Sequence, residues 1–303
     1  MASLKPYPQP DYDYNAKQLV EIYRNARKEI QRQLDDFLLS EDFTSAAVAQ
    51  ARLQAVERIL SELGRVASER ATQAVTSSYL SGIESAQHAI GVTINAVLTT
   101  PHKRMVAALV ADTQNDILAT NAYIDKQVKR AVREAMSEGI RATLGSGDNS
   151  AKQIKADVLR RLRKKLGDAA NTALTDSVGR RWDVDRYIDT LVFTKQKDAH
   201  MEASRVEAVE RGVEYGVIIG PPAKDACRYH VGRVVRMTEA GDTQYMTLDE
   251  LRGSGQIFHP KCRHSVVPYA DPTQLSPTRQ QTAESQEKAG RQALATGKRN
   301  PTL

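Results

Sequence analysis

Hydrophobic residues recur at helical spacing through most of the first half of the chain. Over residues 16–39 the apolar positions follow i, i+3, i+4, i+7, the spacing of an amphipathic helix. The same period continues over 44–81, with Thr44 as N-cap and Gly82 as the residue expected to weaken it, and again over 102–143. These three long patterns predict a helical body, for which a coiled-coil-like bundle is the default.

The pattern changes after a Gly/Ser/Asn-rich stretch. Residues 145–150 have the composition of a linker, and the stretch after it predicts another amphipathic helix. A further helix is predicted over 184–212, capped by Asp183 or Asp185, and Gly212 ends it.

Beyond Gly212 the apolar runs are short and β-branched. Segments 215–219, 231–237 and 265–269 read as strands. Between the last two, Thr247-Leu-Asp-Glu250 has the capping-box pattern of a short helix that runs through Arg252. A small α+β module is therefore expected at about 183–270.

Both ends of the chain are polar or proline-rich. The first fourteen residues hold Pro6, Pro8 and Pro10, which favour an extended arm, and the chain after Asp271 is polar, with a helical segment near 283–295. The predicted fold is mainly α: an elongated N-terminal helical body, a small α+β module with a Cys/His loop clamp, and a polar tail. The predicted divisions are an extended arm at 1–14, a helical body at 15–144, a linker with a basic helix at 145–182, the module at 183–270 and a flexible tail at 271–303.

Composition narrows the class of protein. The chain is 41% hydrophobic and 26% charged, ordinary values for a soluble protein. It has no apolar run of about 18 residues that would cross a membrane, and its first residues lack the apolar core of a signal peptide. With two cysteines in all, a disulfide framework is not expected. Thiols or metal ligands in a reducing cytoplasm fit better.

The positive charge is concentrated in the helix after the linker. Residues 151–167 hold seven Lys or Arg against the single acid Asp157, an excess equal to the net charge of +6 for the whole chain. Two interpretations stay open: a solvated face of a packed helix, or a surface that contacts nucleic-acid phosphates. The candidate contact residues are Lys152, Lys155, Arg160, Arg161, Arg163, Lys164 and Lys165.

Cysteine and histidine gather in two short motifs near the C-terminal end. Cys227-Arg-Tyr-His230 and His259-Pro-Lys-Cys262-Arg-His264 contain both cysteines and three of the six histidines. Thiolate and imidazole are donors that zinc prefers, so the predicted ligands of a structural zinc site are Cys227, His230, His259 and Cys262, with His264 as the alternative. An equal interpretation is two cysteines packed as small apolar groups. A Cys–His catalytic pair is weaker, because no orienting acid or oxyanion loop is evident.

The remaining titratable residues give no such pattern. His102 has no partner near it in sequence, and Glu207 and Glu210 have the spacing of a solvated helix face.

Several motifs of the second half together resemble a known family. They are Gly179-Arg-Arg-Trp182, Tyr187, the run Thr194–Ala208, Cys227-x-x-His230-x-Gly232, Phe258-His-Pro-x-Cys-Arg-His264 and Pro268-Tyr269. This set is similar to the phage minor capsid proteins, which are related to the MuF-type phage head morphogenesis proteins. The resemblance covers about residues 170–270. One departure is Phe193, where relatives tend to carry an arginine.

The resemblance implies a structural virion protein of a tailed phage rather than an enzyme. Its expected partners are the portal or major capsid protein, in multiple copies per virion, and packaged DNA. The protein would be made in the host cytoplasm and end in the phage head. The alternative is an enzyme or toxin-like effector whose Cys/His module acts on nucleic acid or nucleotides.

Overall fold

The structure is a computed structural model that describes residues 7–40, 45–145, 151–175, 179–240 and 242–303. The chain divides into two compact units. Residues 1–12, 73–111 and 190–303 belong to the first, and 13–72 and 112–189 belong to the second. Helices α2, α3 and α5 contribute residues to both, and α1 contributes its first residue, Tyr12, to the first unit.

The second unit is built from helices that the hydrophobic period predicted. They are α1 (Tyr12–Leu39), part of α2 (Ala46–Ile90), part of α3 (Thr100–Gly145) and α4 (Ala151–Asn171). Leu19, Tyr23 and Ile30 of α1 are fully buried, as are Ile117 and Ile124 of α3. The predicted N-cap Thr44 and the residues 146–150 lie outside the described part of the chain.

A short hairpin that the sequence analysis did not predict follows α4. Strands β1 (Thr172–Thr175) and β2 (Arg181–Asp183) pair antiparallel, with Leu174 opposite Trp182. Asp183, one of the two predicted caps, accepts from the backbone N–H groups of Asp185 and Arg186 and so begins α5 (Val184–Glu210).

In the first unit, α5 has two buried faces. Ala199 and Ala203 pack against Tyr79 and Ile83 of α2, with partly buried residues of α3 beside them. Gly82, expected to weaken α2, instead allows a close approach: a Cβ there would lie 2.2 Å from the carbonyl oxygen of His200. Gly82 does not end the helix, which continues to Ile90.

The other face of α5 meets the C-terminal module. β3 (Tyr215–Ile219) is the central strand of an antiparallel sheet, between β4 (Val234–Arg236) and β5 (Ser265–Tyr269). All three predicted strands are confirmed. Met201 of α5 packs into the module core, which is formed by Ile218, Cys227, Val235, Met237, Leu248, Leu251, Ile257, Cys262 and Val266.

Short helices complete the module. α6 (Leu248–Gly253) has the predicted capping box: Thr247 accepts from the N–H of Glu250, and Glu250 accepts from the N–H of Thr247. Two 3₁₀ turns, η1 (Ala226–Tyr229) and η2 (Pro272–Gln274), flank the sheet.

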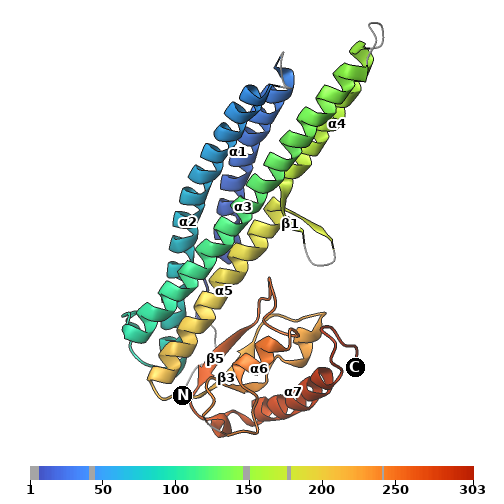
Figure 1. Cartoon of the computed structure of the whole chain (residues 1–303). Coiled ribbons are helices and arrows are strands. Elements are labelled where there is room, and N and C mark those ends of the chain that lie inside the picture. Colours follow the sequence, from blue (N-terminus) through green and yellow to red (C-terminus); the bar gives the residue numbers. More distant parts are fainter. Residues whose placement is uncertain (1–6, 41–44, 146–150, 176–178, 241) are drawn as a thin grey trace. The chain divides into compact units, whose positions relative to one another are not determined.

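The helical segment predicted near 283–295 is confirmed and belongs to a longer helix, in a tail that was otherwise expected to be flexible. Helix α7 (Pro277–Ala295) packs beside η1 within the module (Figure 1). Its buried contacts, described below, come from Arg233 and Gln256, which lie far away in sequence. None of the described helices is long and apolar enough to cross a membrane.

Candidate metal site

A tight turn brings His259 and Cys262 together. The N–H of Cys262 donates to the carbonyl of His259 at 2.9 Å, and Lys261 between them has φ 63°. A side chain in this left-handed region costs about 1–3 kcal/mol. Pro260 begins the turn with a φ that its ring fixes. The strained turn places an imidazole and a thiol on the same side of the loop.

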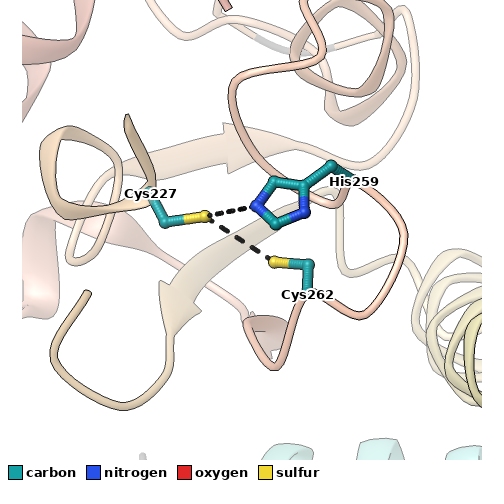
Figure 2. Close-up of side chains that lie close together, drawn as sticks. All are labelled: Cys227, His259 and Cys262. Atoms are coloured by element: carbon teal, nitrogen blue, oxygen red, sulfur yellow. Dashed lines mark hydrogen bonds between the residues drawn. The ribbon is translucent and has the colours of Figure 1, made fainter. Parts of the chain in front are cut away.

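The 3₁₀ turn η1 supplies the second thiol. Asp225 caps this turn by accepting from the N–H of Cys227 at 3.1 Å. Cys227 Sγ then lies 3.4 Å from His259 Nε2 and 3.8 Å from Cys262 Sγ. Figure 2 shows the three side chains pointing toward one another. We call Cys227, His259 and Cys262 the clamp; their ligand atoms all lie within 4.8 Å of one another.

These separations match the edges of a tetrahedral zinc site. Bonds of about 2.3 Å to sulfur and about 2.0 Å to nitrogen give a span of about 3.8 Å between two sulfurs and about 3.5 Å between sulfur and nitrogen. The clamp shows 3.8 Å and 3.4 Å for these pairs. The donors are thus spaced for one ion without moving the backbone.

Backbone carbonyls orient the two histidines next to the thiols. His259 Nδ1 lies 3.0 Å from the carbonyl of Pro260, and His264 Nε2 lies 3.0 Å from the carbonyl of Pro221. Because a carbonyl only accepts, each of these nitrogens donates a proton. Such a second hydrogen bond is the usual support of a metal-ligating histidine. A bound metal needs the lone pair of the other ring nitrogen, which in His259 also faces the carboxylate of Asp225 at 3.1 Å.

Two further donors lie beside the clamp, each close to one of its members, but neither belongs to the group within 4.8 Å. His264 Nδ1 is 3.4 Å from Cys262 Sγ, and Asp225 Oδ2 is 3.1 Å from His259 Nε2. His264 was the predicted alternative ligand, whereas Asp225 was missed. The signal for Asp225 was its position two residues before Cys227, which suits a turn cap.

The two thiols differ in acidity. The hydrogen bond from Cys227 and the contacts with His264 lower the pKa of Cys262. The hydrogen bond to Cys262, together with burial, raises the pKa of Cys227. Both are also buried in the apolar core of the module, so the packed-thiol interpretation has structural support beside the metal one.

His230, a predicted ligand, is not brought into the clamp. Its Nε2 lies 3.0 Å from Gln256 Oε1, and its Nδ1 accepts from Arg233 Nη1 at 2.9 Å. Arg233 in turn donates to Glu287 of α7 at 2.8 Å, and Gln256 donates to the carbonyl of Ala293 at 2.8 Å. We call Arg233, His230, Gln256 and Glu287 the latch, since they attach α7 to the module. Both ring nitrogens of His230 are therefore occupied.

Cations cover the outside of the loop. Lys261 Nζ and Arg263 Cζ lie 4.4 Å and 5.1 Å from the ring centre of Phe193. Phe193, the departure from the expected arginine, thus provides an aromatic face for two cations. A hollow of about 10 Å³ reaches Cys262 and His259. That is room for about one water molecule, so a nucleotide does not fit in it.

The predicted nucleic-acid contacts all lie on α4. Arg160, Arg161, Arg163, Lys164 and Lys165 are exposed. Acids of the same unit neutralise part of the cluster: Arg163 pairs with Asp35 of α1 at 2.9 Å, and Lys165 pairs with Glu134 and Glu138 of α3 at 2.7 and 3.1 Å. The side chains of Lys152 and Lys155 are outside the described part of the chain.

Fold and site together define a predominantly helical protein that ends in a small α+β module with a Cys/His cluster in its core. The family described as phage minor capsid protein 2 matches residues 10–299. The chain belongs to this family, which confirms the resemblance seen in the motifs. No curated protein and no solved structure matches the chain. The protein is thus a structural component of the virion, located in the phage head.

Proposed function

We propose that this minor capsid protein docks on the portal or the major capsid protein through its helical body. The observation that carries the proposal is the family match, which covers residues 10–299 and therefore the helices as well as the module. The helices α1 to α4 supply the long surface that such docking needs.

A groove between α1 and α2 supports docking of a protein partner. It has a volume of about 410 Å³ and is lined by the apolar side chains Ile22, Ala26, Ile59, Leu63 and Val66, with Arg58 and Glu62 at its edge. An apolar groove with charged edges fits the apolar face of a partner helix. In a virion, neighbouring head proteins are the available partners.

Co-expression with the portal and major capsid proteins tests docking. The wild-type protein is expected to co-purify with one of them and to appear in assembled heads. Ile59→Glu places a charge in the groove and is expected to reduce this association at least tenfold. The matched control is Ala51→Glu, at an exposed position of the same helix. Docking through the groove is wrong if the two variants associate equally well.

We further propose that the clamp holds a structural zinc ion. Its support is the separation of its donor atoms and the hydrogen bonds that orient His259 and His264. A zinc ion would join η1 to the loop before β5, two segments about thirty residues apart. Such a crosslink stabilises the folded module, because the unfolded chain lacks the assembled ligands.

Contact with packaged DNA is the last part of the proposal. Its support is the exposed basic side chains of α4. Since Arg163 and Lys165 already pair with acids, Arg161 and Lys164 are the stronger candidates for phosphate contacts.

The salt dependence of duplex binding tests the DNA contact. The variant Arg161→Gln/Lys164→Gln is expected to reduce the slope of log K against log salt by about 1.8, at about 0.9 for each phosphate contact. Arg163→Gln/Lys165→Gln has the same change of charge and is expected to change the slope less. Equal slopes for wild type and both variants would rule out this face of α4.

A further inference from the structure

A second group of potential metal ligands lies in the first unit, away from the two cysteines. His102 is in the first turn of α3, and Glu207 and Glu210 are in the last turn of α5. The sequence analysis left His102 without a partner and placed both glutamates on a solvated face. The structure corrects this: His102 is fully buried, the Glu207 side chain is 5% exposed and that of Glu210 is 30% exposed.

The three side chains converge on one point. His102 Nε2 lies 3.0 Å from Glu207 Oε2 and 3.4 Å from Glu210 Oε2, and the three ligand atoms lie within 4.8 Å of one another. Metal bonds of about 2.1 Å give ligand spans of about 3.0 Å in octahedral and about 3.4 Å in tetrahedral geometry. The observed separations fall in that range.

One proton on His102 Nε2 cannot make a well-aligned hydrogen bond to both carboxylates. If His102 Nε2 carries a proton, that proton must be shared between two carboxylate oxygens at unequal distances. Like charges in a poorly solvated site repel. Arg211 compensates Glu207 through Oε1 at 2.6 Å, and a cation at His102 Nε2 would compensate Glu210 as well. An ion bound to all three atoms satisfies both carboxylates at once.

Other side chains hold the ligands as the outer partners of a metal site do. Tyr79 Oη lies 2.9 Å from His102 Nδ1, where it can accept the Nδ1 proton and leave Nε2 as a lone-pair donor. Thr99 Oγ1 donates to the carboxylate of Glu210 at 2.9 Å. Tyr79 is on α2, and Thr99 comes three residues before His102 in the chain.

Glu207 is held in the same way. Its Oε1 accepts from Gln87 Nε2 at 2.8 Å and from Arg211 Nε at 2.6 Å, so Oε2 is left for an ion. One neutral donor and one cation thus fix the orientation of this carboxylate.

We propose that His102, Glu207 and Glu210 bind a divalent transition-metal ion that joins the start of α3 to the end of α5. One imidazole and two carboxylates form a mixed nitrogen–oxygen set, which suits Mn²⁺ or Zn²⁺ rather than the soft ions that prefer thiolates. Among the described residues the clamp offers the soft thiolate donors, so the two proposed sites would differ in chemistry.

Manganese alone distinguishes the sites, because Mn²⁺ favours carboxylate over thiolate ligands. Full-length metal-free protein is titrated with Mn²⁺, and free Mn²⁺ is measured by electron paramagnetic resonance. One Mn²⁺ per chain is expected, displaced by Zn²⁺. Glu210→Gln, at the most exposed of the three ligands, is expected to weaken binding at least tenfold, and Cys262→Ser to leave it unchanged.

The matched control is Glu284→Gln, which makes the same change at an exposed glutamate of α7. A proton-bridged cluster without a metal would show no Mn²⁺ binding in the wild type, and that result overturns the proposal. Equal binding by Glu210→Gln and Glu284→Gln also overturns it. Because Glu210 is partly exposed, a circular dichroism melt of Glu210→Gln is expected to show an intact fold; His102→Gln provides a second ligand variant.

Discussion

The clamp and the latch each contain a residue of the motif Cys227-Arg-Tyr-His230, but the two residues have different surroundings. Cys227 and His230 are three residues apart, yet Cys227 faces His259 and Cys262, whereas His230 faces Arg233 and Gln256. In the clamp, the ring nitrogen of His259 and the two sulfurs lie within 4.8 Å of one another. In the latch, each nitrogen of His230 already has a partner.

This difference separates a ligand from a structural histidine. A metal ligand needs one ring nitrogen with its lone pair free and the other held by an acceptor. The carbonyls of Pro260 and Pro221 hold one nitrogen of His259 and His264, and the other nitrogen of each ring faces a thiol of the clamp. His230 does not meet the condition, because Arg233 can only donate and so occupies the lone pair of Nδ1.

The largest expected effect is the loss of zinc from the clamp. Cys262→Ser is expected to bind one zinc fewer per chain than the wild type, measured by elemental analysis of purified protein. At free zinc about 1,000-fold above Kd, the ion stabilises the folded wild type by about 4 kcal/mol. A chelator should therefore lower the unfolding free energy of the wild type by about this amount more than that of Cys262→Ser.

The packed-thiol interpretation gives a different result in the same experiment. Cys262→Ser would then lose stability through its buried hydroxyl, but zinc content and the response to chelator would equal those of the wild type. The variants His264→Ala and Asp225→Ala are compared in the same way. The residue whose replacement reduces zinc affinity more is the fourth ligand.

The next largest effect is expected at the ion pair of the latch. Arg233 is fully buried, Glu287 Oε2 is 2.8 Å from its Nε, and Arg233 Nη2 has no partner among the described residues. Glu287→Gln keeps the shape but leaves the guanidinium charge uncompensated, so a loss of about 3–5 kcal/mol is expected in urea unfolding. Glu284→Gln on the same helix is the control; equal losses would show that the pair contributes little.

Sequence periodicity was enough for the long helices and for β3, β4 and β5, because it records which face of each element is buried. It did not predict the hairpin of β1 and β2. For α7, whose residues are mostly polar, a helical segment was predicted but its attachment to the module was not. That helix is ordered by partners distant in sequence: Arg233, and Gln256, which donates to the carbonyls of Ala293 and Lys298. Composition records no such long-range contact, so the tail was expected to be flexible.

The sequence predicted part of the metal site. Residue type and spacing identified Cys227, His259 and Cys262, because thiols and imidazoles in short turns are suited to metals. They did not separate His230 from His264, since that depends on whether Arg233 or a backbone carbonyl faces the ring. Arg233 is one of two arginines in the otherwise apolar stretch 231–237, and nothing in its sequence position indicates that it is fully buried.

Lower pH is expected to weaken the latch more than the apolar core around it. Burial lowers the pKa of His230 to about 4, below the ordinary value of about 6.5. The unfolded chain then binds more protons than the folded one, so stability is complete above about pH 6.5 and falls as pH drops toward 4. The full contribution is about 3 kcal/mol.

Comparing wild type with His230→Gln isolates this effect. The amide of glutamine accepts from Arg233 and does not titrate. The unfolding free energy of His230→Gln is therefore expected to fall less than that of the wild type between pH 6.5 and pH 4. Both are measured with chelator present, which removes any contribution of bound metal. His200, whose pKa burial lowers to about 3, is common to both proteins and cancels. Parallel curves would contradict the assignment of His230 to a neutral, buried state.

The smallest effect concerns the contact between α7 and Arg233, and its sign is the test. A Cβ at Gly290 would lie 2.5 Å from Arg233 Nη1 and 2.9 Å from its Cδ, while Glu287 and His230 prevent the guanidinium from moving away. Alanine normally stabilises a helix by about 1 kcal/mol relative to glycine. Here the overlap, of about 1–3 kcal/mol, is expected to outweigh that gain and lower the unfolding free energy. Gly253→Ala is the control, since its Cβ would meet nothing within 4 Å. If Gly290→Ala were the more stable protein, α7 would not be held tightly against Arg233, and the latch would be a looser contact than the clamp.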